Sequence, residues 1–275
     1  MKRLPRNANL IAGGILVLAI LATASLSFFY TPQDPNRMNL SMRFQPPNPS
    51  HLLGTDQYGR DILSRVMKGA INSLIVGWVA VGIGMSFGIL LGSLAAFWGG
   101  WKDEGLMRLV DVLYGFPAVL SAVLITSILG PGIVNSMAAI GIFNIPIFTR
   151  LTRGASMSVW HRDYVTSARA IGQSNGSIIW TTILPNVLSP LIVQGTVQFA
   201  IAILAEAALS YLGLGTQPPH ASWGRMLNEA QTFMEISPWL AIFPGLAIAW
   251  AVLGFNLLGD GLRDLLDPKV TRIRK

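Results

Sequence analysis

The stretch DYVTSARAIGQSNGSIIWTTILP, residues 163–185, decides the fold of this chain. It is too hydrophilic to enter a bilayer, yet it lies between residues 132–148 and residues 187–212, which are apolar enough to span one. A polar segment between two membrane spans has to lie at the membrane surface. The sequence therefore predicts a polytopic membrane protein from which this segment projects.

Two short helices joined by an elbow are expected within this stretch. Tyr164, Ala168 and Ile171 recur at i, i+4 and i+7, which is the spacing of an apolar stripe on one helix. Gly172 interrupts this helix, and the Asn-Gly pair that follows favours a turn. Ser177 is the expected N-cap of the second helix.

The same stretch contains a family motif. The order Ser-Ala-Arg-Ala-Ile-Gly at residues 167–172, followed after twelve residues by Pro185, resembles the Glu-Ala-Ala loop of ABC importer permeases. This copy departs from the motif at three positions. Thr166 stands where glutamate is expected, Ser167 replaces the first alanine, and Thr182 falls on the position of an isoleucine.

The resemblance implies a cytoplasmic coupling helix that inserts into a groove of an ATPase subunit. A cytosolic loop without this role is the alternative, and no ion pair of the family's glutamate is implied at Thr166. The residues that the resemblance assigns to coupling are Tyr164, Val165, Thr166, Ser167, Ala168, Arg169, Ala170, Ile171, Gly172 and Pro185.

Two further segments narrow the resemblance to one branch of these permeases. Residues 54–69 and residues 259–268 resemble the C-type subunits that serve dipeptides, oligopeptides and nickel. The resemblance therefore covers nearly the whole chain, and it implies a core like that of the MetI permease. Anchoring of the following span is a simpler role for residues 54–69 than direct contact with the substrate.

The composition of the chain supports a location in lipid. Of its 275 residues 52% are hydrophobic and 12% are charged, with a mean hydropathy of +0.52, whereas about a quarter of the residues in a soluble domain are charged. The chain has no cysteine and three scattered histidines. Disulfide frameworks, thiolate metal sites and a clustered zinc centre are therefore excluded.

Six apolar runs predict an all-α polytopic protein with six transmembrane helices. The expected spans are residues 10–29, 71–97, 106–129, 132–148, 187–212 and 239–258. The expected organisation is a cytoplasmic N-terminus (1–9), a first span (10–29), an external linker with an interfacial amphipathic helix (30–70), a five-helix permease core (71–262) and a cytoplasmic tail (263–275). Within the core we expect a cytoplasmic coupling loop (150–186) and an external helix (213–238).

The first apolar run also has features of a secretory signal. The triplet Ala-Thr-Ala at residues 22–24 follows a basic start and is typical of a cleavage site. The run nevertheless continues through Phe28 and Phe29, where a mature soluble protein would turn polar. A retained span is the preferred prediction, and the later spans are the same in both cases.

Residues 55–69 are expected to form the amphipathic helix in the outer interface. Thr55 or Asp56 is its expected N-cap. Its apolar face would contain Ile62, Leu63, Val66 and Met67, and its polar face would contain Arg60, Asp61, Arg65 and Lys68.

Small residues recur at intervals of four in two spans. Because lipid provides no hydrophobic drive for helix association, such stripes predict close packing against another helix. The alternative is that these glycines have no packing role, because glycine is generally common in membrane helices. The stripes are Gly84, Gly88, Gly92 and Ala96 in the second span, and Ala241, Gly245 and Ala249 in the last.

Three residues are candidates for lining a translocation path. Phe116 and Pro117 break the third span, either beside the conduit or at an ordinary packing kink. Glu206 is the one acidic residue deep in an apolar run, and it either lines the path or makes a hydrogen bond between helices. At the inner end of the third span, Arg108 and Asp111 are expected to pair with each other.

The external segment contains a candidate gate or docking surface. Its apolar residues recur at spacings of three and four and predict an amphipathic helix, for which interfacial anchoring is the simpler role. The candidate residues are Trp223, Met226, Leu227 and Phe233.

Positive residues are unevenly divided between the two sides of this topology. Fourteen of them fall on the side of residues 163–185 and six on the other side. Because lysine and arginine favour the cytoplasmic side, the coupling segment and both termini are predicted to be cytoplasmic. Membrane orientation also explains the net charge of +7 without a nucleic-acid partner.

These features lead to a hypothesis about function. The chain contains no G-x-x-x-x-G-K-[ST] loop, so ATP and magnesium are expected on partner subunits, with no cofactor and no catalysis in this chain. The resemblance implies a permease subunit of a bacterial inner-membrane importer, partnered by a second permease in a heterodimer, two ATPase subunits and an external solute-binding protein. Peptides are the expected substrates, with nickel chelates and glutathione as related possibilities.

Two other classes of function are less consistent with the sequence. An ion-coupled secondary transporter generally has several ionisable or unwound sites at mid-membrane, and Glu206 is the one that qualifies. A membrane-embedded hydrolase would need paired acids, a histidine-rich metal set or an activated nucleophile in the spans, and the sequence offers none.

Overall fold

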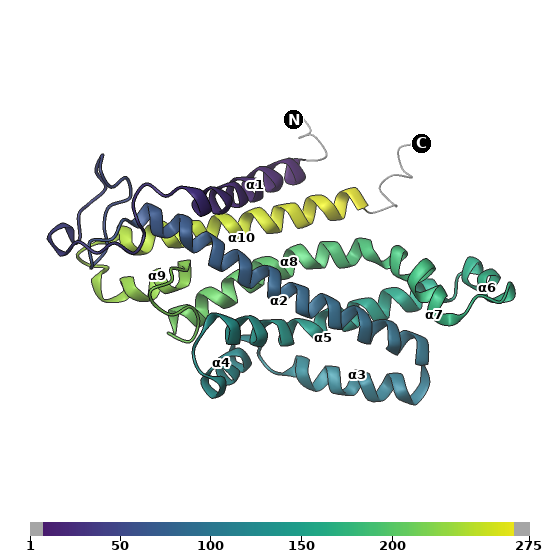
Figure 1. The fold of residues 1–275 in the computed structure, drawn as a ribbon. Helices are drawn as coiled ribbons and strands as arrows, with labels where there is room; N and C mark the ends of the chain where they lie inside the picture. The colour runs from purple at the N-terminus through teal and green to yellow at the C-terminus, as the bar shows by residue number, and fades with distance from the viewer. Residues whose placement is uncertain (1–7, 267–275) are drawn as a thin grey trace, which may run out of the picture.

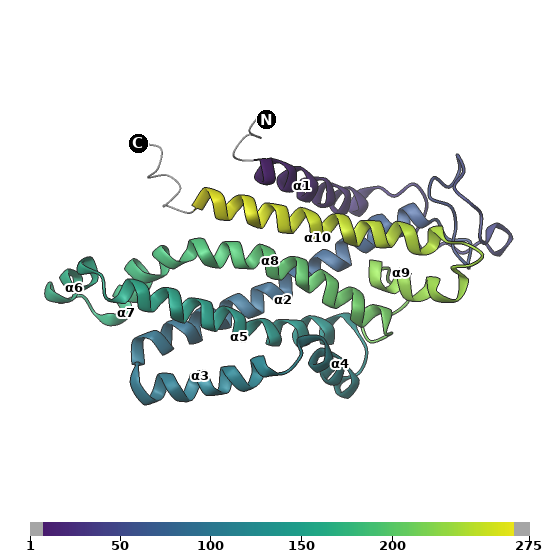
Figure 2. The ribbon, with the colours of Figure 1, turned by 180° about the vertical axis from the view of Figure 1, so that it is seen from behind.

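The computed structural model describes residues 8–266, which form long helices that run side by side along the molecule (Figure 1). A two-helix elbow extends from one end, and a loop with a short helix covers the other end, as the reverse view also shows (Figure 2). The elements are α1 (Ala8–Phe29), η1 (Leu40–Met42), α2 (Ile62–Trp98), α3 (Gly100–Gly115), α4 (Ala118–Leu129), α5 (Ile133–Trp160), α6 (Asp163–Ala170), α7 (Asn175–Ile178), η2 (Ile179–Ile183), α8 (Leu184–Tyr211), α9 (Trp223–Ala230), η3 (Gln231–Phe233) and α10 (Trp239–Leu266).

The helices account for the six expected spans. Five helices are long and apolar enough to cross a membrane, namely α1, α2, α5, the continuous helix Asn175–Tyr211, and α10. The pair α3 and α4, at the remaining expected span, is apolar enough when taken together and is bent by 86° between its halves, which is the shape of a broken span or of a re-entrant loop. The bend falls at Phe116 and Pro117, where the sequence predicts a break. The fold is therefore that of an all-α polytopic membrane protein.

The start of α2 differs from the prediction. A separate interfacial helix followed by a span at residues 71–97 was expected, but one helix of 37 residues begins at Ile62. Its N-cap is Asp61, whose carboxylate accepts a hydrogen bond from the Ser64 backbone at 2.8 Å, and not Thr55 or Asp56. The polar face was also wrong, because Arg60, Asp61 and Arg65 are buried.

The glycine stripe of α2 packs closely against α5. A methyl group added at Gly84, Gly88 or Gly92 would overlap Asn144, Phe148 or Thr149 of α5. The predicted packing role of this stripe is confirmed for its three glycines. The expected stripe of α10 is wrong, because Gly245 has open space beside it and Ala249 is exposed. Instead, Gly254 and Gly261 of α10 approach Leu16 and Leu10 of α1.

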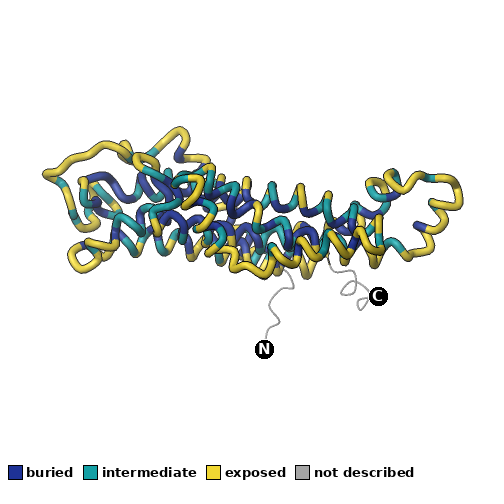
Figure 3. Tube along the Cα trace, turned by 90° about the horizontal axis from the view of Figure 1, so that it is seen from below, coloured by how far each residue is buried: buried dark blue, intermediate teal, exposed yellow. Residues whose placement is uncertain are grey.

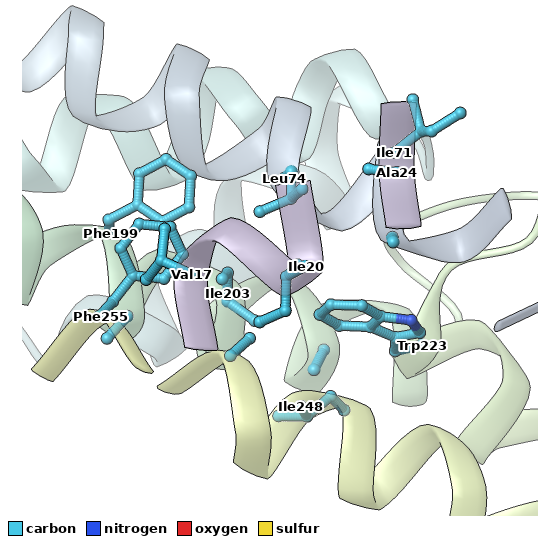
Figure 4. Packing of buried hydrophobic residues seen from close by; sticks show 14 residues of the cluster. Val17, Ile20, Ala24, Ile71, Leu74, Phe199, Ile203, Trp223, Ile248 and Phe255 are labelled. Atoms are coloured by element: carbon cyan, nitrogen blue, oxygen red, sulfur yellow. The ribbon is translucent and has the colours of Figure 1, made fainter. Parts of the chain in front are cut away.

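A hydrophobic core joins five helices of the bundle (Figure 4). Residues of α1, α2, α8, α9 and α10 contribute to it, among them Val17, Leu74, Ile203, Trp223 and Ile248. The rings of Phe199 and Phe255 stack with their centroids 4.2 Å apart. Buried residues follow the long helices, whereas the segments at both ends of the molecule are exposed (Figure 3).

The two predicted cytoplasmic termini fall mostly outside the described residues. Residues 1–7 of the expected N-terminal segment, and residues 267–275 of the expected tail, lie outside the described residues. The described parts of α1 and α10 that adjoin them point toward the end of the molecule that bears α6 and α7 (Figure 1).

Candidate functional site

The candidate site is the elbow formed by α6, α7 and η2. Helix α6 ends in a Schellman motif, because the Gly172 backbone donates to the Arg169 carbonyl at 2.9 Å and the Gln173 backbone donates to the Ala168 carbonyl at 3.1 Å. Gly172 has φ +84°, in the left-handed region that this motif requires. A single residue therefore determines the direction in which the chain leaves α6.

The second helix begins earlier than expected. Ser174, and not Ser177, is its N-cap, and the Ser174 hydroxyl accepts from the Ser177 backbone at 3.3 Å. The Gln173 amide crosses the elbow and donates to the hydroxyls of Ser177 and Thr181, each at 2.9 Å. From η2, a π-helical segment, the chain continues directly into α8. The elbow is thus closed by hydrogen bonds of its own.

The face of α6 that packs on the bundle is not the predicted stripe. Val165 is fully buried and lies in a cluster with Phe148 of α5 and Val187 of α8, with Ala168 packed partly against it. Tyr164 is 46% exposed and Ile171 is 84% exposed. Ile171 leaves the stripe because it is the C-cap and no longer helical.

Aromatic contacts attach α6 to the neighbouring ends of two spans. The Arg169 guanidinium lies 4.6 Å from the centre of the Trp160 ring at the end of α5. Trp160 in turn makes an edge contact with Phe97 at the end of α2, with centroids 6.0 Å apart. A movement of α6 would therefore be transmitted to α5 and α2, which are packed together along the glycine stripe.

The remaining residues assigned to coupling are placed as follows. Thr166, Ser167 and Ala170 are exposed on α6, next to Tyr164 and Ile171. Pro185 is separated from them by α7 and η2, and it lies in the first turn of α8. It lines a groove of about 720 Å³ between α8 and α10, together with Arg263.

The ion pairs of α3 differ from the predicted pair of Arg108 with Asp111. Arg108 pairs with Glu104, one turn earlier, and not with Asp111. Asp111 pairs instead with Arg150 of α5, because the α3 surface faces that helix. Arg153, also on α5, makes a bidentate contact with the carboxylate of Asp103.

The candidates for a translocation path do not come together in this chain. Phe116 is 59% exposed at the bend between α3 and α4, and Pro117 is also exposed. Glu206 has no exposed surface. Its carboxylate accepts hydrogen bonds from Ser210 at 2.6 Å and from Ser73 of α2 at 3.2 Å. This geometry favours the second alternative for Glu206, a hydrogen bond between helices.

The apolar face of α9 is turned into the protein. Trp223 is 2% exposed, and its indole nitrogen donates to the Val66 carbonyl of α2 at 3.0 Å. Met226 is also buried and Leu227 is partly buried against the core. The expected exposed docking surface is therefore not formed by these residues. Phe233 lines a pocket together with residues of the loop before α2.

Sequence reasoning missed a charge network at the outer end. Arg60 and Arg65 both donate to the carboxylate of Glu229, which lies on α9 more than 160 residues away. Arg60 precedes α2 and Arg65 lies in its first turn. The spacing of these arginines in the sequence predicted a solvated face, so no local pattern identified this partner. Among residues 8–266, no three histidine, aspartate or glutamate side chains form a group that could hold a metal ion.

Together these observations define a multi-pass membrane protein with a structured polar elbow at one end. Residues 88–272 match the family model described as "Binding-protein-dependent transport system inner membrane component". The chain belongs to this family.

Individual relatives match along almost the whole chain. The dipeptide transport system permease protein DppC of Alkalihalophilus pseudofirmus is 44% identical, covering 98% of this chain and 88% of that protein. The glutathione transport system permease protein GsiD of Pectobacterium atrosepticum is 43% identical, covering 98% and 90%. The di/tripeptide transport system permease protein DppC of Pseudomonas aeruginosa is 43% identical, covering 96% and 89%.

A solved structure has the same fold. A chain of the MetNI methionine ABC transporter in inward-facing form superposes with a TM-score of 0.56 at 14% identity, covering 72% of this chain and 95% of that chain. The expected MetI-like architecture is confirmed at the level of the fold.

Proposed function

We propose that this chain is the permease subunit of an ATP-driven importer and forms half of a translocation path for peptides, including the tripeptide glutathione. The observation that carries the proposal is the similarity over 98% of the chain to permeases named for dipeptide and glutathione transport. The chain would carry out no chemistry itself, since the energy would come from ATP and magnesium bound to partner subunits.

The elbow is the proposed coupling element. An exposed isoleucine and an exposed tyrosine on a polar projection would provide an apolar contact for an ATPase groove, while Val165 holds the helix to the bundle. Because the elbow is closed by its own hydrogen bonds and attached to α5 and α2 through Trp160, it would move as a rigid body with the ATPase.

The proposed orientation puts the elbow in the cytoplasm, with both termini on the same side. Fourteen positive residues belong to that side and six to the side of α9. The positive-inside rule counts lysine and arginine residues and not net charge, so ion pairs on either side leave this excess unchanged. In this orientation α9 and the loop before α2 face the outside, where a binding protein would approach.

The proposed assembly contains this chain, a second related permease, two ATPase subunits and an external solute-binding protein. Reconstituting these components in proteoliposomes tests the function directly. We expect peptide uptake that requires ATP and the binding protein. Uptake driven by a proton or sodium gradient in vesicles that lack the ATPases would overturn the proposal and indicate a secondary transporter.

A further inference from the structure

A pocket of about 410 Å³ lies at the outer end of the molecule, between the loop that precedes α2 and the helices α9 and η3. Its lining includes Arg43 and Tyr58 from the loop, Arg225 and Glu229 from α9, and Phe233 from η3. Elements far apart in the sequence thus form one cavity, and its charged lining residues are Arg43, Arg225 and Glu229.

A buried ion network adjoins this pocket. The Glu229 carboxylate accepts hydrogen bonds from Arg60 at 2.7 Å, from Arg65 at 3.1 Å and from Arg225 at 3.2 Å. The Asp56 carboxylate accepts one from Arg60 Nε at 2.6 Å. Because the network joins the loop to α2 and α9, it holds the wall of the pocket in place.

Guanidinium groups outnumber carboxylates in this region. The three arginines of the network share Asp56 and Glu229, and Arg43 on the pocket rim adds a fourth guanidinium that has no ion-pair partner within residues 8–266. Arg43 is exposed, so its guanidinium is open to a ligand from outside. A guanidinium without an ion-pair partner favours a carboxylate ligand, with which it can make charge-assisted hydrogen bonds.

The apolar wall of the pocket is held in an unusual backbone conformation. Phe44 has φ +57°, a region that residues other than glycine rarely adopt. This conformation places its ring against Phe233, with centroids 5.0 Å apart. Since such conformations persist where the surroundings enforce them and often occur at functional sites, the wall is consistent with a built site. An apolar wall beside arginines suits an acidic side chain with an aliphatic stem.

We propose that this pocket receives an acidic side chain of the extracytoplasmic binding protein and pairs it with Arg43 and Arg225. The inference rests on the proposed function, which puts this end of the molecule outside. A binding protein has to be held at the outer surface, and this pocket is built from an external loop and α9 and η3. A substrate, by contrast, has to move on between spanning helices.

Docking affinity provides the first test. The complete transporter is embedded in nanodiscs, and the binding of its purified binding protein is measured by surface plasmon resonance. Arg43→Glu should weaken docking by about tenfold or more, most strongly at low salt. Arg37→Glu is the matched control, because Arg37 is an exposed arginine on the same loop outside this pocket, and it should change docking by less than about twofold. Equal effects of the two variants, or none for Arg43→Glu, would overturn the proposal.

Chemical crosslinking provides the second test. In the Arg43→Lys variant, a carbodiimide should join the new amine to an aspartate or glutamate of the docked binding protein, and mass spectrometry should identify the pair. The Arg37→Lys variant should yield no such product. If the Arg43→Lys variant yields none while docking remains intact, the proposed ion pair is wrong.

Uptake of peptides with a free or an amidated C-terminus shows whether the carboxylate bound in the pocket belongs to the binding protein or to the substrate. If Arg43→Glu leaves docking unchanged but lowers uptake of peptides with a free C-terminus, and not of amidated peptides, the pocket serves the substrate and the proposal is wrong. Failure of the proposed function has a different signature, because the wild-type transporter itself would then neither dock a binding protein nor show ATP-driven uptake.

Discussion

The carboxylate of Glu206 lies among hydroxyl groups of Ser73, Ser210 and Thr216, which join α8 to α2 and to the segment before α9. In glutamine the carbonyl oxygen can accept from Ser210 and Thr216, and the amide nitrogen can donate to the Ser73 hydroxyl once that hydroxyl rotates to accept, so Glu206→Gln should leave uptake nearly unchanged. Glu206→Leu would leave buried hydroxyls unpaired and should lower stability by about 1–3 kcal/mol, measured by thermal unfolding in detergent. If Glu206→Gln abolishes uptake while the protein remains folded, Glu206 belongs to the transport path.

Thr166 occupies the position where the family motif has glutamate, and it is exposed near the start of α6. An acidic side chain there would interact favourably with the helix dipole, by about 0.3–1 kcal/mol. Thr166→Glu should therefore preserve or increase the affinity for the ATPase subunits, measured by co-purification. A fivefold or greater loss would show that the groove of this ATPase has diverged from the motif.

Single residues also show the limits of sequence reasoning. The break at Phe116 and Pro117 could be predicted, because proline acts on the local backbone. The buried state of Arg60 and Arg65 could not, because it depends on Glu229 and the packing of a distant helix. Ile171 was assigned to the stripe of α6, but the Schellman motif ends the helix before it.

At the scale of elements, the contact between α2 and α5 depends on the size of one side chain. Gly88→Ala would push a methyl group into Phe148 and should destabilise the protein by about 1–3 kcal/mol. Gly82→Ala is the matched control, because Gly82 is on the same helix with no atom within 4 Å of the added methyl group. Thermal unfolding in detergent compares the two, and equal melting temperatures would contradict the packing role of the stripe.

The angle of the elbow depends on Gly172. A β-branched residue is strained at φ +84° by about 1–2 kcal/mol, so Gly172→Val should redirect the chain after α6. We expect normal membrane insertion with loss of both ATPase co-purification and uptake. Gly176→Val is the control, since Gly176 has a helical backbone and open space around it. Full uptake by the Gly172→Val variant would show that coupling does not depend on the angle of the elbow, and it would contradict the proposed role of the elbow.

The ends of helices could be predicted where the hydropathy of the sequence changes. They could not be predicted where packing against a distant segment determines where a helix begins. The spans followed from apolar length, and the α2 stripe followed from its glycines. The continuation of α2 back to Ile62 and the inward orientation of Trp223 depend on each other, because the indole of Trp223 bonds to Val66 within that extension. No local pattern indicates such a contact between distant segments.

At the scale of the whole molecule, the two ends of the chain have separate proposed functions. One end carries the elbow, and the opposite end carries α9 and the loop before α2 (Figure 1). The elbow is attached to α5 and α2, and the opposite end contains the pocket lined by Arg43 and Arg225. Among the described residues the bend of α3 and α4 is exposed whereas Glu206 is fully buried, so the candidate path residues do not come together within this chain. In the proposed assembly, the second permease would complete the path.

The side of the membrane on which the elbow lies tests the central claim most directly. The chain contains no cysteine, so Ile171→Cys introduces a unique thiol at a position that is 84% exposed. A membrane-impermeant maleimide should label it in inside-out vesicles stripped of the ATPases and not in intact cells, and adding back the ATPase subunits should block the reaction. Labelling from the outside of intact cells, or labelling that the ATPases do not reduce, would contradict the account.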